Sequence, residues 1–361
     1  MIREFIADSQ SCNNIGISRI HKLTYTLVGW RRFIGPYAEN TNADITRAIL
    51  TLRNAKHARG RPFAKNTVRD HITILKQFYY WLIENGYTEI DERKLKRVKT
   101  PPCDAMTKTA SDILTPEEVT AMVNACTRSV DRATIMMLYE GGFRIGELAQ
   151  MAWGDLVADK YGYVVNVDFK TGKPRYIRLI MAAQHISSWK ADYPFEPAAD
   201  SLVFITRYKT PLTHHSIEKQ LQRIAGYAGI EKHITPHIFR HSRITHLIKD
   251  GVSESVIKLM MWGTINTPMF QTYAHLAGKD IDIEMLRSYG IATTEEDAPT
   301  RLEPRQCKNC HTINAPTSSF CSTCGFSLTE DAAATIEDAK QDIASDPDVM
   351  QAIFDQMFEK K

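Results

Sequence analysis

The chain has 361 residues, 43% of them hydrophobic, and a formal net charge of +3. This length provides for two or three domains, each with its own core. No run of eighteen apolar residues occurs, and the first ten residues contain no apolar signal region. The composition therefore excludes a membrane span and a secretory signal, and a cytoplasmic protein is expected.

Charge is distributed unevenly along the chain. Residues 1–100 contain 18 Lys and Arg against 9 Asp and Glu, whereas residues 291–361 contain 6 against 13. A basic first part indicates a surface that grips nucleic acid, and an acidic end indicates a segment with another role. Basic faces are also often simply solvated, so charge alone does not decide the matter.

Residues 1–97 are expected to form a small helical domain, with the first 17 residues polar and loosely ordered. Helical patterns occur over 17–34 and 44–60, and a third helix is expected to start at Thr67 and stop at Gly86. Basic residues cluster where the third helix starts. Side chains and helix N–H groups together suit phosphates there, although a solvated face is the alternative. The candidates for DNA contact are Arg59, Arg61, Lys65 and Arg69.

Residues 98–113 are expected to be a linker. Two prolines beginning at Pro101 prevent a helix from continuing, and the rest of the segment is small and polar. A helix then restarts after Thr115, the expected N-cap, with a glutamate three residues on to complete a capping box. It opens a second domain over 114–290. The fold class expected for the chain is mainly α with a small antiparallel β-sheet near 155–180.

Two basic side chains stand out in the first half of the second domain. A Gly-Gly turn after the apolar run ATIMMLY ends one helix, and Arg144 begins the next with Glu147 one turn on. Two alternating, β-rich runs then flank Lys-Thr-Gly-Lys-Pro, which predicts a β-hairpin with Lys170 at its entry and Arg175 at its exit. Taken singly, Arg144 could cap a surface helix and Lys170 could be a solvated charge.

The segment TPHIFRHSRITHL places His237 and Arg240 on one helix face, three residues apart. The segment MMWGTINTPMFQTYAHL, which follows, contains Tyr273 and His275. Taken alone, the His and Arg would be ordinary surface or capping residues, and the Tyr a core aromatic. The pair formed by His237 and His241 has zinc-ligand spacing, but the Glu of an HExxH motif is missing, so no metal is expected there.

Four cysteines near the end of the chain have the pattern CKNC, ten residues, CSTCG. Two such Cys-x-x-Cys pairs supply four thiolates for tetrahedral Zn²⁺, which predicts a zinc ribbon over 300–328. The metal would be structural because no ligand position is left open. Disulfides are the alternative, which a reducing cytoplasm disfavours. An acidic helical tail over 329–361 follows. The predicted zinc ligands are Cys307, Cys310, Cys321 and Cys324.

The order of these residues along the chain, Arg, Lys, His-x-x-Arg and then Tyr, resembles that of the tyrosine recombinase (phage integrase) family. GFRIGEL resembles the family's first box, KTGKPRYIRL its catalytic hairpin, HIFRHSRITHL its second box and MFQTYAHL its nucleophile segment. The resemblance is close over 114–290, which it identifies as an integrase-type catalytic domain. It is looser over 1–97, which would be the helical core-binding domain. The tail and the residues around the nucleophile resemble archaeal members more than bacterial ones.

The resemblance implies attack by the Tyr273 hydroxyl on a DNA phosphodiester, which leaves a 3′-phosphotyrosyl bond that needs no ATP for rejoining. Arg144 and Arg240 would clamp the phosphate, since guanidinium groups match phosphate oxygens. His237 would contact the same phosphate and exchange a proton with the tyrosine. Lys170 would protonate the leaving 5′ oxygen.

Other residues would support these expected catalytic residues. Lys170 is preferred to Lys173 because its spacing to the hairpin exit fits the family hairpin. The supporting side chains are Glu147, His241 and His275. The sequence departs from the family where a His or a Gly-Trp is usual before the nucleophile, because it reads Met-Trp-Gly-Thr there. Trp262 is assigned to this position, where its indole N–H can donate to a phosphate oxygen but accept no proton. A packing Trp is the alternative.

The resemblance implies a site-specific recombinase that cuts and rejoins double-stranded DNA for integration, excision or dimer resolution. It would act near the nucleoid as a homotetramer on paired sites, with no catalytic metal and no nucleotide, and the chain has no GxxxxGK[ST] loop. A type IB topoisomerase-like nicking-closing enzyme shares the chemistry and is one alternative. A catalytically silent DNA-binding regulator is another, although the five strongest positions are intact.

Overall fold

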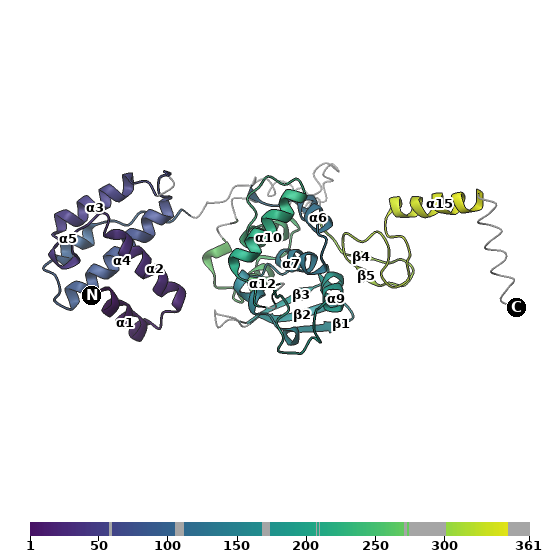
Figure 1. Cartoon of the computed structure of the whole chain (residues 1–361), viewed down its shortest axis with the longest axis horizontal. Helices are drawn as coiled ribbons and strands as arrows, with labels where there is room; N and C mark the ends of the chain where they lie inside the picture. Colours follow the sequence, from purple (N-terminus) through teal and green to yellow (C-terminus); the bar gives the residue numbers. More distant parts are fainter. Residues whose placement is uncertain are drawn as a thin grey trace. The chain divides into compact units, whose positions relative to one another are not determined.

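The computed structural model describes residues 1–57, 60–104, 112–167, 174–206, 208, 210–270, 273 and 301–345. The chain divides into two compact units, Met1–Thr107 and Lys108–Lys361. The point of division lies inside the segment predicted to be a linker. Figure 1 follows the elements of each unit along the chain.

The first unit packs helices around one apolar core that includes Trp30, Phe78 and Leu82, all with no exposed surface. Its elements are α1 (Ile2–Asn13), α2 (Ile17–Trp30), the short 3-10 helix η1 (Tyr37–Glu39), α3 (Asn42–Asn54), α4 (Lys65–Glu84) and α5 (Glu92–Arg97).

Helix α1 covers Ile2–Asn13, so the prediction of a loosely ordered start was wrong. Helix α1 is anchored by Phe5, which is buried. The Phe5 ring centroid lies 5.1 Å from that of Phe78 and 5.7 Å from that of Trp81. Edge-on aromatic pairs of this kind are favourable. One buried ring thus holds a polar segment whose local composition gives little sign of order.

Two further helix boundaries differ from the prediction. Helix α4 begins at Lys65, two residues before Thr67, and α3 ends at Asn54, well before Gly60. After α3 the chain becomes extended, and the His57 N–H donates to the Arg61 carbonyl at 2.9 Å, so the backbone turns back on itself. The predicted stop of α4 is confirmed, since Gly86 follows the helix with φ 69°.

The second unit is mainly helical with a small antiparallel sheet, as predicted. Its helices are α6 (Pro116–Asn124), α7 (Ser129–Glu140), α8 (Ile145–Gln150), α9 (Ala183–Ala191), α10 (His214–Tyr227), α11 (Pro236–Lys249), α12 (Glu254–Trp262), α15 (Glu330–Ser345) and the 3-10 helices η3 (Trp153–Asp155) and η4 (Pro268–Phe270). The capping box predicted at the start of α6 is confirmed, with the Thr115 hydroxyl accepting from the Glu118 N–H at 3.2 Å and the Glu118 carboxylate accepting from the Thr115 N–H at 2.8 Å.

The sheet has the order β1 (Leu156–Asp159), β2 (Gly162–Val167) and β3 (Arg175–Leu179), with antiparallel neighbours. Alternate residues of β3 face the core, as the two-residue period of a strand requires. They are Arg175, Ile177 and Leu179, all at most 2% exposed. A guanidinium group therefore occupies a position on the apolar face of the sheet.

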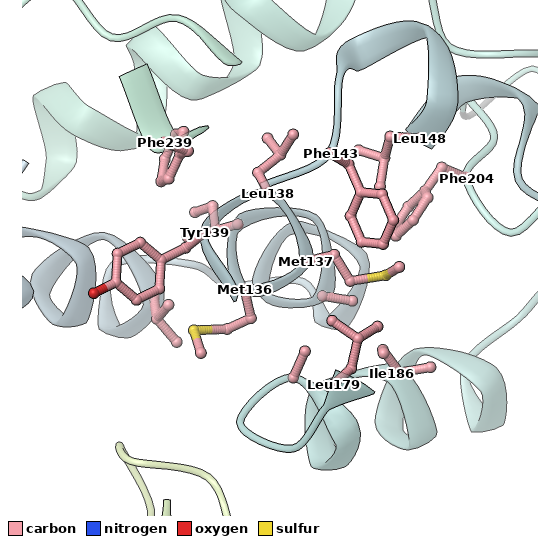
Figure 2. Packing of buried hydrophobic residues seen from close by; sticks show 14 of the residues in the cluster. Met136, Met137, Leu138, Tyr139, Phe143, Leu148, Leu179, Ile186, Phe204 and Phe239 are labelled. Carbon is pink, nitrogen blue, oxygen red and sulfur yellow. The ribbon is translucent and has the colours of Figure 1, made fainter. Parts of the chain in front are cut away.

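Helix α7 is the centre of the second core. It contacts α6, α9 and α11, and nearly all of its residues are buried. A helix that is buried on nearly all of its sides forms part of a core. Figure 2 shows Met136, Met137, Leu138 and Tyr139 leaving α7 in different directions towards surrounding apolar side chains. This packed helix ends at a glycine turn that leads directly to Arg144.

The C-terminal segment of the second unit has two short paired strands, β4 (Arg305–Gln306) and β5 (Ile313–Asn314), followed by α15. Helix α15 begins with Glu330 and Asp331 and buries only Ala332. No helix in the described part of the chain is both long enough and apolar enough to cross a membrane.

Candidate active site

Arg144 is held at the start of α8 by Glu147. The Arg144 N–H donates to the Glu147 Oε2 atom at 2.7 Å, and its guanidinium Nη1 donates to Oε1 at 2.8 Å. The Glu147 side chain is 5% exposed, whereas that of Arg144 is 32% exposed. One side of the guanidinium group is thus fixed by a buried carboxylate while another part of the side chain remains open to solvent.

Arg240 lies on α11 and is buried, and its guanidinium group contacts two backbone carbonyls. Nη1 donates to the Gly142 oxygen at 2.6 Å, and Nη2 donates to the Met261 oxygen. Its Cζ atom lies 5.4 Å from the centroid of the Trp262 ring. Burial and the neighbouring guanidinium groups of Arg175 and Arg144 hold the pKa of Arg240 well below its usual range. The group nonetheless stays charged at neutral pH, because its lowered pKa is still about 9.

The close approach at Gly142 depends on the absence of a side chain. Gly142 has φ 54°, in the left-handed region that favours glycine. A Cβ atom there would lie 2.7 Å from the Met261 sulfur, closer than real contacts allow. The Gly-Gly turn therefore brings the carbonyl that Arg240 binds and the start of α8 against the end of α12.

Tyr273 packs against His241 and Trp262. Its hydroxyl shares a 2.7 Å hydrogen bond with His241 Nδ1, and its ring centroid lies 6.2 Å from that of Trp262. The side chain is 4% exposed. Burial raises the pKa of the Tyr273 hydroxyl to about 12. The positive charge of Arg240 has the opposite, smaller effect and lowers this pKa. The phenol in this arrangement is protonated at neutral pH.

The sequence named His237 as the proton partner of the tyrosine, but the hydroxyl contacts His241, one turn further along α11. His237 lies in the first turn of α11 and is exposed, whereas His241 is half-buried. A residue three or four places away on a helix lies on the same face, so His237 shares a face of α11 with Arg240 and with His241. The i,i+4 spacing of the two histidines was visible in the sequence, but His241 was predicted to have only a supporting role.

Several candidates lie outside the described residues, namely Lys170, Lys173, His275 and Arg59. Of the remaining candidates for DNA contact, Arg61 and Lys65 are exposed, and Arg69 lies 3.9 Å from Asp70. Lys65 is the first residue of α4, whose first turn contains no acidic residue. The backbone N–H groups in the first turn of a helix attract anions, and the positive charge of Lys65 at the start of α4 adds to this attraction.

Arg175 is the site residue that the sequence reasoning missed. It was described only as the exit of the hairpin, yet its Nη2 pairs with the Glu147 carboxylate and its Nη1 donates to the Met260 carbonyl at 2.8 Å. The available signal was the alternation of β3, which places position 175 on the same face as Ile177 and Leu179. A charged residue at a core-facing position needs a buried partner.

The four tail cysteines form a cluster whose sulfur atoms all lie within 4.8 Å of one another. Cys307 and Cys324 are 3.6 Å apart, and Cys310 and Cys321 are 3.5 Å apart. A disulfide requires about 2.05 Å, whereas four thiolates at about 2.3 Å around Zn²⁺ lie roughly 3.8 Å apart. The cluster therefore fits a tetrahedral zinc ion.

Comparisons with known proteins found similarity over much of the chain. Residues 112–279 match the model of the phage integrase family. The chain is 25% identical over 263 residues to tyrosine recombinase XerC of Xanthomonas campestris pv. campestris (strain B100), covering 69% of this chain and 75% of the relative.

Two solved structures share the fold. One is the Tn1549 transposon integrase in complex with a circular intermediate DNA, with TM-score 0.61, 17% identity and coverage of 80% of this chain and 99% of that chain. The other is a lambda integrase tetramer bound to a Holliday junction, with TM-score 0.57, 14% identity and coverage of 75% and 76%.

Proposed function

We propose that this chain, which carries a phage integrase family domain, is a tyrosine site-specific recombinase that cuts and rejoins double-stranded DNA. The observation that carries the proposal is the arrangement at the junction of α8, α11 and α12, where the Trp262 ring lies against both Arg240 and Tyr273. Arg144 is joined to this group through Glu147 and Arg175, which binds the same Met261 carbonyl as Arg240. Relatives and structural neighbours that are recombinases and DNA-bound integrases support the same conclusion.

The two guanidinium groups would bind the non-bridging oxygens of the scissile phosphate. Arg144 is braced by a carboxylate and Arg240 by two carbonyls, so both are oriented before DNA arrives. Preorganised donors of this kind act where negative charge develops in the transition state, and the loss of one costs about 3–4 kcal/mol of activation free energy. The indole N–H of Trp262 would add a third donor to the same oxygens.

Tyr273 would be the nucleophile. Its oxygen forms a bond to phosphorus as the bond from phosphorus to the 5′ oxygen breaks, which leaves a 3′-phosphotyrosyl ester and a free 5′ hydroxyl. The phenolic proton passes to an imidazole, for which His241 is already in contact and His237 lies one turn away. Lys170, in the role predicted for it, would supply a proton to the leaving oxygen. The 5′ hydroxyl of a partner strand then reverses the step.

The buried state of Tyr273 implies that cleavage requires a rearrangement on DNA. A hydroxyl with a pKa raised to about 12 is a poor nucleophile until the phosphate and the cations beside it are in place. Exchange between two duplexes requires several such subunits, so the expected assembly is a homotetramer on paired sites. In the proposed recombinase, residues 1–97 would be the core-binding domain and residues 300–328 a structural zinc ribbon. We expect the protein to work in the cytoplasm at the nucleoid, and the likeness to archaeal members stays a prediction.

The test is covalent trapping on DNA. A pool of nicked duplexes with a randomised core is incubated with the protein, and strands that remain linked to protein under denaturing conditions are sequenced. Wild type should select one sequence class and Tyr273→Phe should trap nothing. The absence of any wild-type adduct, or equal trapping by the Phe variant, would refute the proposal. Relaxation of plasmids that lack the selected sequence would instead identify a topoisomerase-like enzyme.

A further inference from the structure

Arg175 lies where a strand would normally place an aliphatic side chain. It shares the buried face of β3 with Ile177 and Leu179, and its side chain is 1% exposed. Burying a guanidinium group is costly unless its charge and its donors are satisfied. A hydrophobic side chain of similar size would usually be at least as stable in such a position. Stability of the fold therefore does not explain the presence of arginine there.

One half of the Arg175 guanidinium group is bound to Glu147. Nη2 pairs with Oε2 of that carboxylate, which also accepts the Arg144 N–H, while Oε1 accepts from the Arg144 guanidinium at 2.8 Å. A single buried carboxylate thus lies between two guanidinium groups. The contact from β3 adds a third hydrogen bond to this carboxylate, beside the two from Arg144.

The other half of the Arg175 guanidinium group binds the end of α12. Nη1 donates to the Met260 oxygen at 2.8 Å and to the Met261 oxygen at 3.2 Å. The Met261 oxygen also accepts from Arg240. The last carbonyls of a helix have no partner within the helix and lie at the negative end of its dipole, so two cations satisfy them well. Trp262, which follows directly, is thereby placed next to Arg240.

We propose that Arg175 is a positioning residue for DNA cleavage, which holds Arg144 through Glu147 and holds Arg240 and Trp262 through the end of α12. The proposal rests on the proposed function. Arg175 touches no reacting atom in this scheme. It joins strand β3 to the elements that carry the phosphate-binding groups, so that the separation of these groups is set before DNA binds.

The experiment measures single-turnover adduct formation and DNA affinity separately, on the duplex that wild type selects from the randomised pool. Arg175→Met should form adduct about 10- to 100-fold more slowly, since a displacement of about 1 Å costs a factor of that order. DNA affinity, which depends on exposed contacts over the whole duplex, should stay within about twofold. Arg178→Met is the matched control, because Arg178 lies on the same strand and pairs with Asp159 on the partly exposed face. Its cleavage rate should be unchanged.

A double-mutant cycle separates positioning from a general loss of structure. If Arg175 acts through Arg144, then Arg175→Met should cost much less in an Arg144→Lys background than in wild type. A merely structural role predicts penalties that multiply. Multiplying penalties, or a wild-type rate for Arg175→Met, would overturn the proposal.

Arg175→Lys decides the question if the Met variant does not fold. A lysine retains its charge but cannot contact Glu147 and both carbonyls together, so partial recovery of the rate is expected. Full recovery would show that charge alone suffices and would overturn the proposal. Failure of the proposed function is recognised differently, by the absence of an adduct with wild type.

Discussion

Substitution of Gly142 by alanine should damage both the stability of the second unit and its chemistry. The residue has φ 54°, and the left-handed region costs an ordinary residue about 1–2 kcal/mol. The new Cβ would also meet the Met261 sulfur at 2.7 Å and its terminal carbon at 2.9 Å. Relief of such overpacking costs about 1–3 kcal/mol more. The expected loss in the free energy of unfolding is therefore roughly 2–5 kcal/mol.

The chemical effect follows from the carbonyl of the same residue, which accepts from Arg240 Nη1 at 2.6 Å. A shift of the turn away from Met261 moves that acceptor and, with it, the guanidinium group. Because misplacement by about 1 Å costs on the order of 100-fold in rate, adduct formation should fall by that order even at temperatures where the variant is folded.

The assay is urea unfolding together with single-turnover trapping on the selected duplex. Gly146→Ala is the matched control, because Gly146 lies within α8 and a Cβ there meets nothing within 4 Å. Alanine inside a helix should stabilise by about 0.5–1 kcal/mol and leave cleavage unchanged. If Gly142→Ala were as stable as wild type and equally active, the account of this turn would be refuted.

Three other predictions concern the rest of the second unit. Removal of the capping side chain by Thr115→Ala should cost about 1 kcal/mol in the free energy of unfolding, and an unchanged urea midpoint would contradict the capping role. Strong chelators, or Cys310→Ser, should unfold the segment that contains the cysteine cluster, with release of one zinc per chain; retained protease resistance without metal would exclude a structural zinc. Burial lowers the pKa of His246 to about 4, below the reference value of about 6.5, so its contribution to stability is complete above pH 6.5 and is lost as the pH falls towards 4. His246→Gln should make stability less dependent on pH across that window, and an unaltered slope in urea titrations would show that other groups, such as His185, account for it.

Short-range patterns accounted for much of the molecule. The capping box at Thr115, the glycine turn before Arg144 and the paired strands around the hairpin were predictable because each depends on residues a few positions apart. The spacing of the cysteines likewise predicted a cluster, since a Cys-x-x-Cys turn brings its two sulfur atoms together without help from the rest of the fold. The order of Arg, His-x-x-Arg and Tyr was enough to indicate a resemblance to the family whose model residues 112–279 match.

Contacts between distant parts of the chain decided the rest. Arg175 binds Met260 across 85 positions, and Tyr273 meets His241 across 32, so neither partner could be chosen by spacing. Helix α1 is likewise held by a contact between distant positions, since Phe5 packs against the rings of Phe78 and Trp81 on α4. Local propensity decides which segments become helix, strand or turn, but which charge receives a buried partner depends on where whole elements pack. That packing is a property of the assembled core, and it places the guanidinium groups of Arg240 and Arg175 and the phenol of Tyr273 at one junction.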